Sequence, residues 1–365
     1  MTIELGLDTF GDVSPTHVNT ASVNTSGVNT SGAAATDSPL PPGAGAATLR
    51  NVLTQAILAD EVGVDAIGIG EHHRDDYAIS APEVILGAIA ARTSRIRLGS
   101  AVTVLSSDDP IRVFERFSTI DALSSGRAEV TLGRGSFTES FPLFGFDLGH
   151  YEELFTEKLG LFAALRTGAP VTWSGTLRPP LTHQRVFPEL GAPPLPTWIA
   201  VGGSPESVVR AATYGLPLKL AIIGGDPRRF APYVDLYRRT LNRLGTPTDL
   251  PVGVHSPGHI ADTDDAAREA LWPHYRRNIA RIGAERGWPP PTRAEFDRAA
   301  GPGGSLYVGS PETVAAKIAD TVRALGLARF DLKYSHGTLG HSHLMRSVEL
   351  YGTQVIPRVR ELLSD

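Results

Sequence analysis

The sequence predicts an α/β protein folded as a single (β/α)₈ barrel, the TIM-barrel architecture, over residues 1–365. From about residue 46, short apolar runs alternate with longer stretches of helical periodicity, which is the pattern of repeated βα units. With an earlier run at 3–8, eight such apolar runs can be counted, and eight is the strand number of a closed barrel. On strand count alone, an open doubly wound sheet remains the alternative.

The candidate strands are short segments rich in Val, Ile, Leu or Phe. They are 3–8, 65–70, 96–105, 128–133, 197–201, 218–223, 252–261 and 330–334. The stretches between them are the candidate helices. These cover roughly 46–62, 81–93, 110–124, 149–168, 204–214, 227–244, 263–285 and 311–326, with a last helix near 341–363.

Two segments interrupt this alternation. Residues 11–45 hold three Val-Asn-Thr triplets and an Ala, Pro and Gly tract, so they offer little apolar area to offset the entropy of ordering. We expect a flexible excursion there. Residues 286–304 are rich in Pro and Gly, which argues against regular structure. A loop of this length is often a lid, and we expect one here.

Composition excludes several classes of function. Cysteine is absent, so disulfides, thiolate metal sites and a thiol nucleophile are excluded. The formal net charge is −5 and no basic block occurs, which makes nucleic acid an unlikely partner. No apolar run reaches the roughly 18 residues of a membrane span, and the N-terminus lacks a signal-peptide pattern. We therefore expect a cytoplasmic protein without a membrane partner.

The densest titratable cluster follows the second strand, at the end of a barrel where functional groups project. It runs from Glu71 through His72 and His73 to Asp76. Adjacent residues of an extended segment point to opposite sides, so one histidine can face the pocket and serve in acid–base chemistry. A metal site and a pair of purely structural histidines are the alternatives.

Two further strand ends suit an anion. Arg134 lies between glycines after the fourth strand, where a fixed cation and open backbone can bind an oxyanion. After the fifth strand, Gly202 and Gly203 precede Ser204, Pro205 and Ser207, and Ser204 is expected to be the N-cap of a helix. The free amides at a helix start favour an anion.

The string after the fifth strand is nearly repeated at 309–313, so by itself it is only a good capping sequence. Convergence with Arg134 on the neighbouring strand makes the first copy a candidate phosphate site. Weaker candidates at other strand ends are Asp226 as an N-cap, His255 and His259 around the seventh strand, and 333–336 after the eighth.

Taken in order, these motifs resemble the bacterial luciferase-like family of flavin-dependent oxidoreductases, the luciferase-like monooxygenases. The resemblance covers nearly the whole chain after the 11–45 excursion. It rests on six ordered blocks: 70–73; 98–105 with 109–112; 121–127; 133–135; 202–207; and 308–312. The fold that it implies is again a (β/α)₈ barrel.

The resemblance also implies site residues. The phosphate of FMN is expected at Arg134, Ser204 and Ser207 together with the backbone of Gly203. His72 matches the catalytic histidine of the family.

Two further positions bear on the flavin ring. Ala101 and Val102 match the place where these barrels have a non-prolyl cis peptide beneath the ring. Gly133 stands where luciferases have a cysteine, and this departure argues against luciferase's aldehyde chemistry and light emission.

The function implied is that of an FMN-dependent oxidoreductase, in the first place a monooxygenase that uses reduced FMN and oxygen on a small organic substrate. A separate flavin reductase would supply the reduced FMN, and we expect a homodimer. The alternatives are an F420-dependent dehydrogenase or reductase on the same fold, a non-catalytic flavin-binding protein, and a metal-dependent barrel hydrolase.

Overall fold

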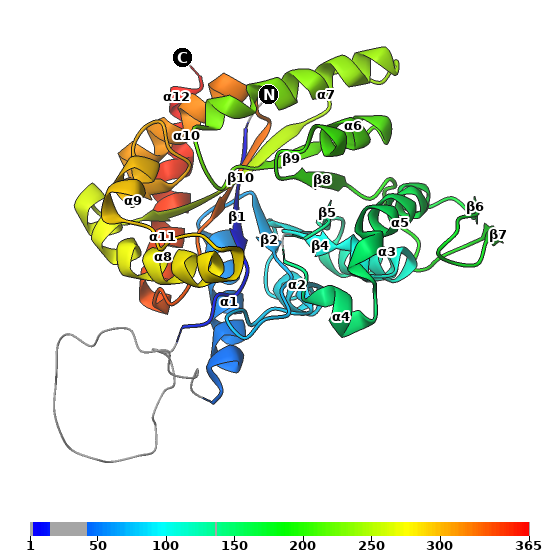
Figure 1. The fold of residues 1–365 in the computed structure, drawn as a ribbon, viewed down its shortest axis with the longest axis horizontal. Helices are drawn as coiled ribbons and strands as arrows, with labels where there is room; N and C mark the ends of the chain where they lie inside the picture. Colours follow the sequence, from blue (N-terminus) through cyan, green and yellow to red (C-terminus); the bar gives the residue numbers. More distant parts are fainter. Residues whose placement is uncertain (1–2, 15–41, 136, 365) are drawn as a thin grey trace.

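The computed structural model describes residues 3–14, 42–135 and 137–364. Its parallel strands form a nearly closed barrel in the order β3-β2-β1-β12-β10-β9-β8-β5-β4, with β11 added beside β10 (Figure 1). The barrel strands are β1 (Glu4–Thr9), β2 (Ala66–Ile69), β3 (Arg97–Ser100), β4 (Thr103–Val104), β5 (Val130–Gly133), β8 (Thr197–Val201), β9 (Leu218–Ala221), β10 (Val252–Ile260), β11 (Tyr307–Gly309) and β12 (Arg329–Lys333).

The barrel closes through β3 and β4, which are two halves of the predicted strand 96–105. Near the N-terminal end of β5, Leu98 of β3 forms a parallel bridge with Ala128. Near the C-terminal end of β5, Thr103 of β4 pairs with Leu132. The predicted (β/α)₈ barrel is therefore confirmed, and the open sheet is excluded.

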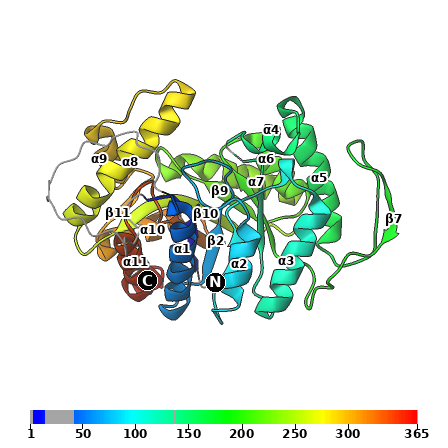
Figure 2. The ribbon, with the colours of Figure 1, turned by 90° about the horizontal axis from the view of Figure 1, so that it is seen from below.

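Helices surround the barrel (Figure 2). Buried apolar side chains of the helices and strands form the hydrophobic core. No helix of the described residues is long and apolar enough to cross a membrane. The α-helices are α1 (Ala44–Glu61), α2 (Pro82–Ala90), α3 (Pro110–Ser124), α4 (Ser140–Phe144), α5 (Tyr151–Leu165), α6 (Pro205–Thr213), α7 (Ala231–Arg243), α8 (Asp264–Arg286), α9 (Arg293–Ala300), α10 (Pro311–Leu325), α11 (His341–Leu350) and α12 (Ile356–Leu362).

The inside of the barrel is charged rather than apolar. Lys219 Nζ lies 2.7 Å from Asp331 Oδ2, and Arg329 donates to both Asp331 and Glu129. Glycines on neighbouring strands leave room for these carboxylates, because a Cβ at Gly6 would collide with Asp331 Oδ1. Buried charges need such close partners to offset their loss of hydration.

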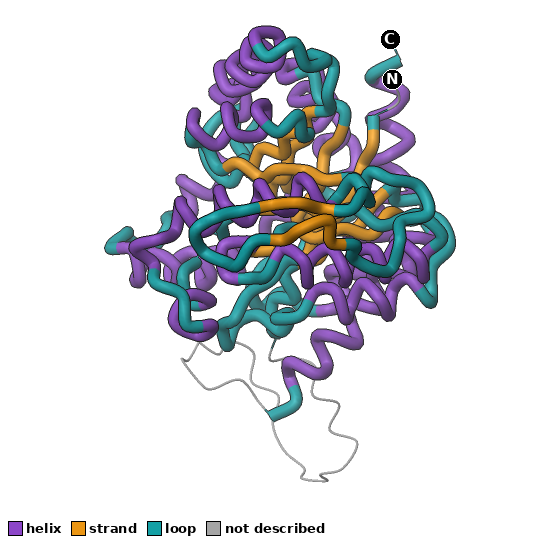
Figure 3. The backbone as a smooth tube through the Cα atoms, turned by 90° about the vertical axis from the view of Figure 1, so that its right-hand side faces the viewer, coloured by secondary structure: helices purple, strands orange, loops and turns teal. Residues whose placement is uncertain are grey.

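An antiparallel hairpin that the sequence did not predict lies between α5 and β8. Its strands are β6 (Val171–Trp173) and β7 (Leu181–Gln184). Figures 1 and 3 show it outside the ring of helices. It belongs to neither the barrel nor the strand ends that hold the candidate site.

The prediction that 286–304 has no regular structure is wrong. The segment contains α9, which begins with a capping box in which Thr292 and Glu295 bond each other's backbone. Phe296 is fully buried and packs on Trp272 and Tyr275 of α8. Favourable capping and this apolar anchor outweigh the flanking Pro and Gly. Whether the segment closes over a ligand stays a prediction.

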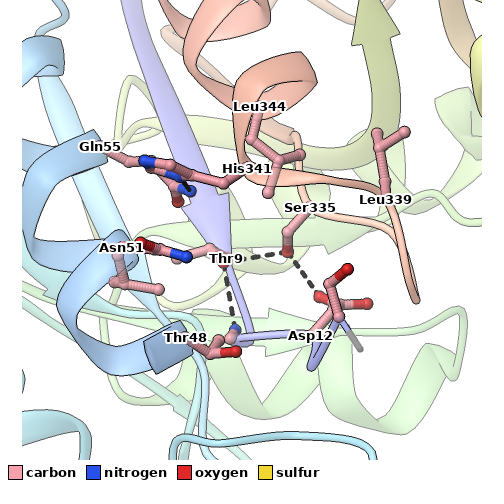
Figure 4. A pocket seen from close by; sticks show the side chains of 12 residues that line it. Thr9, Asp12, Thr48, Asn51, Gln55, Ser335, Leu339, His341 and Leu344 are labelled. Atoms are coloured by element: carbon pink, nitrogen blue, oxygen red, sulfur yellow. Dashed lines mark hydrogen bonds between the residues drawn. The ribbon is translucent and has the colours of Figure 1, made fainter. Parts of the chain in front are cut away.

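The predicted excursion 11–45 lies mostly outside the described residues, which leave out 15–41. Its start is held firmly: Asp12 accepts from Lys333 Nζ at 3.1 Å and from Ser335 Oγ at 2.5 Å. Figure 4 shows Asp12 and Ser335 at a small cavity between α1 and α11. Its volume of about 20 Å³ suits a single water rather than a substrate.

Candidate active site

The loop after β2 separates its two histidines, as predicted. The His72 ring lies among aromatic rings, with centroids 4.4 Å from Tyr77, 4.9 Å from Phe10 and 5.1 Å from Phe137. His73 instead places Nε2 2.9 Å from Glu71 Oε1. His72 is therefore the histidine that belongs to the aromatic group at the barrel mouth.

A carboxylate that the sequence did not single out lies beside His72. Glu139 Oε1 is 3.8 Å from His72 Nδ1. Burial raises the pKa of Glu139. The hydrogen bond and charge of His72, together with hydrogen bonds from backbone amides, outweigh burial and bring the pKa of Glu139 below its ordinary value. An ionised Glu139 can orient the imidazole. Nothing in the local sequence signals this pairing, because the two residues come from different loops.

The peptide bond between Ala101 and Val102 is cis, as the family resemblance led us to expect. It lies between β3 and β4, at the C-terminal edge of the barrel. Gly133 at the end of β5 packs against it, since a Cβ there would come within 2.7 Å of Val102 Cγ2. A glycine at this position thus leaves space for Val102.

The predicted phosphate residues meet between β5 and α6. Arg134 Nη2 donates to Ser207 Oγ at 3.1 Å. Ser204 is the N-cap of α6 and Pro205 its first residue, as predicted, and Ser204 Oγ accepts from the Ser207 amide. Gly203, before the cap, has φ 118°, a conformation that favours glycine. We call Arg134, Ser204, Ser207 and the Gly203 backbone the anion seat.

Two residues that the sequence reasoning missed complete the surroundings of the anion seat. Arg210 lies three residues after Ser207, on the same face of α6, and this spacing could have revealed it. Glu152 of α5 bridges two arginines: one carboxylate oxygen pairs with Arg134 Nη1 and the other accepts from Arg210 Nη2 at 2.8 Å. Arg210 Nη1 is buried without a partner in the described chain. The seat thus holds a carboxylate between two guanidinium groups.

The far end of α8 is tied to the His72 loop by ion pairs. Arg74 donates to Glu285 Oε2 at 2.8 Å and to Asp76 Oδ1 at 3.0 Å. Arg281 Nε lies 3.4 Å from Asp76 Oδ2. The segment 286–304 therefore starts from a fixed point beside the barrel mouth.

No group of three or more His, Asp or Glu side chains that could hold a metal ion occurs in residues 3–14, 42–135 and 137–364.

Comparisons with known proteins agree with this architecture. The family model for the luciferase-like monooxygenases matches residues 25–329. The 4-hydroxyprotoasukamycin monooxygenase of Streptomyces nodosus subsp. asukaensis is 28% identical over 328 residues, covering 82% of this chain and 84% of that protein.

Solved structures share the fold over nearly the whole chain. Monooxygenase RslO1 from Streptomyces bottropensis has a TM-score of 0.78 at 23% identity, covering 97% of this chain and 99% of its own. The oxygenating constituent of 3,6-diketocamphane monooxygenase from Pseudomonas putida, in complex with FMN, has a TM-score of 0.71 at 18% identity, with 98% and 99% covered. An F420-dependent secondary alcohol dehydrogenase has a TM-score of 0.72 at 17% identity, with 98% and 99% covered.

The chain is an oxidoreductase built on a parallel barrel, with a histidine loop, a non-prolyl cis peptide and the anion seat at the C-terminal edge of that barrel. With the match over residues 25–329, the chain belongs to the luciferase-like monooxygenase family.

Proposed function

We propose that this protein is an FMN-dependent monooxygenase that acts in the cytoplasm on a small organic substrate. The observation that carries the proposal is the anion seat, where Arg134 and Ser207 converge at the N-terminus of α6. A phosphate monoester fits this donor set, because a guanidinium, two hydroxyls and free helix amides are the groups that bind phosphate. Nη1 of Arg210, which is buried without a hydrogen-bond partner among the described residues, would supply a further donor.

Arg134, Ser204, Ser207 and the Gly203 backbone would hold the FMN phosphate. Ala101 and Val102 would lie beneath the flavin ring. When bound, reduced flavin supplies the electrons with which oxygen is activated.

The chain's own residues would bind, orient and move protons. His72, with Glu139 at 3.8 Å, can hold a proton at Nε2 or Nδ1 beside the aromatic group. Phe10, Tyr77 and Phe137 would exclude water from that position.

We also infer a separate reductase as the source of reduced FMN, and a homodimer, which size-exclusion chromatography with light scattering would test. F420 remains the competing cofactor, since a fold neighbour uses it. Fluorescence titration with FMN and with F420, followed by oxygen uptake on addition of an FMN reductase and NADH, decides between the two. Tight F420 binding without FMN binding would overturn the proposal and favour a dehydrogenase.

A further inference from the structure

A second histidine at the barrel mouth is paired with a fully buried carboxylate. Asp8, in β1, is 0% exposed, and its Oδ2 lies 2.6 Å from Nδ1 of His255 in β10. Only β12 separates the two strands. Inward side chains from alternate strands of a barrel share one layer, so this contact follows from the topology.

The charge on Asp8 is directed at His255. In the described chain, Asp331 lies within ion-pair distance of two cations, Lys219 and Arg329, whereas His255 is the only such partner of Asp8. Burial raises the pKa of Asp8, but the hydrogen bond and charge of His255, aided by more distant cations, bring it below its ordinary value.

An ionised Asp8 at 2.6 Å fixes the proton on Nδ1 of His255 and leaves a lone pair on Nε2. Nε2 makes no hydrogen bond within the residues that the structure describes, and the side chain keeps 12% of its surface exposed. This nitrogen is therefore accessible to a ligand.

Its surroundings are those of the proposed active site. The His255 ring stacks on Phe10 with a centroid distance of 5.8 Å and an angle of 8°. The same Phe10 contacts His72 edge-on at 4.9 Å. The two histidines thus contact the same phenyl ring.

We propose that His255, positioned by Asp8, accepts the proton of a phenolic hydroxyl on an aromatic substrate. The proposal rests on the proposed function in taking the barrel mouth as the active site. The substrate O–H bond breaks, an Nε2–H bond forms, and the charge of the imidazolium is balanced by the Asp8 carboxylate. The substrate is left as a phenolate, and the proton returns to the product or to water.

The substrate class follows from the acceptor and the walls. A phenol, with a pKa of about 10, lies much closer to imidazole in acidity than an aliphatic alcohol does, so it is the hydroxyl that an imidazole with a carboxylate partner is best suited to ionise. Aromatic side chains such as Phe10 favour an aromatic partner in stacked or edge-on contact. A phenolate ring is richer in electrons than the phenol, which suits an oxygenation.

The test uses 4-nitrophenol, whose phenolate absorbs in the visible range, with the flavin-free full chain at a pH below the pKa of the free phenol. We expect saturable binding with a phenolate band. Both His255→Gln and Asp8→Asn should reduce the bound phenolate at least tenfold. The control His183→Gln, a change at an exposed histidine on the hairpin, should leave the band unchanged.

Competition by 4-nitroanisole, which cannot ionise, shows whether His255→Gln still has a folded pocket, and circular dichroism checks both variants. No saturable binding, a bound phenol that stays neutral, or a phenolate band that survives His255→Gln would each overturn the proposal. Titration of the same samples with FMN tests the proposed function separately. If the wild-type protein does not bind FMN but still shows the phenolate band, the proposed function is wrong and the proposal for His255 stands.

Discussion

Glu152 occupies the place where the flavin phosphate is proposed to bind, so its removal should strengthen FMN binding. Its carboxylate pairs with both Arg134 and Arg210, and an incoming phosphate must displace it from both. Glu152→Gln keeps the shape of the side chain and removes its charge. We therefore expect this variant to bind FMN more tightly, while riboflavin, which lacks the phosphate, binds as before.

The expected size follows from exposure. Glu152 is 57% exposed, while Arg134 and Arg210 are 24% and 15% exposed. Exposed ion pairs contribute roughly 0.2–1 kcal/mol each, so displacing two costs about 0.4–2 kcal/mol. Since about 1.4 kcal/mol is a factor of ten in affinity, the dissociation constant of FMN should fall by about 2- to 30-fold.

Quenching of flavin fluorescence measures both dissociation constants. Glu153→Gln is the matched control, because it makes the same charge change one residue away while its carboxylate pairs with His150 and not with the seat. Weaker FMN binding by Glu152→Gln would show that Glu152 instead holds the arginines in place. An equal gain in FMN affinity in Glu153→Gln would show that the effect comes from the change in net charge and not from the anion seat.

Four other outcomes are expected. Arg134→Ala should weaken FMN binding by about 10- to 100-fold, the loss of a charge-assisted hydrogen bond, and leave riboflavin unaffected; equal losses for both ligands would contradict the anion seat. His72→Ala should keep FMN affinity and lose turnover by about 10²–10⁴-fold in coupled oxygen uptake, and full activity would refute its role. If 286–304 closes over the site, limited proteolysis there should slow when reduced FMN binds, whereas indifferent cleavage would mark a passive connector. Asp12→Asn should lower the free energy of unfolding by about 3–5 kcal/mol at pH 7, because Lys333 loses its buried partner. Burial raises the pKa of Asp12, but Lys333 and hydrogen bonds bring it below its ordinary value; this stability is present above the ordinary carboxyl pKa and is lost as pH falls through the folded value. Denaturant titrations from pH 7 to pH 3 should show a larger loss in the wild type than in the variant, so that the difference between the two narrows as pH falls.

The barrel could be predicted from sequence because its strands are short runs rich in apolar residues, which alternate regularly with stretches of helical periodicity. The sequence signal was weakest where tertiary packing, rather than a local pattern, determines the secondary structure. The hairpin β6–β7 is largely exposed and so has no apolar pattern. Helix α9 did carry a readable signal, the Thr292 and Glu295 capping box, but neighbouring Pro and Gly obscured it.

The same distinction holds for the candidate site: local patterns could be predicted from the sequence, whereas pairings between distant residues could not. The capping string at Ser204 is a local pattern, and the structure confirms its geometry. Pairings such as Glu152 with Arg210 and Asp8 with His255 join residues far apart in the chain. Single residues of this kind carry no periodicity, and only the closed barrel brings them together. The charged barrel interior was unpredictable for the same reason.

Strand order gives the site a direction that favours an elongated cofactor. The anion seat follows β5 and β8, while His72 follows β2 and His255 lies in β10. Around the ring, the two histidines flank β1 and β12, the strands that lie across the barrel from β5 and β8. A ligand anchored by phosphate at the seat reaches the histidines only if its reactive part extends over the barrel mouth. Flavin mononucleotide has that form, with a phosphate at one end and a ring at the other. Inorganic phosphate can occupy only the anion seat, and riboflavin can occupy only the barrel mouth. Each should therefore bind far more weakly than FMN.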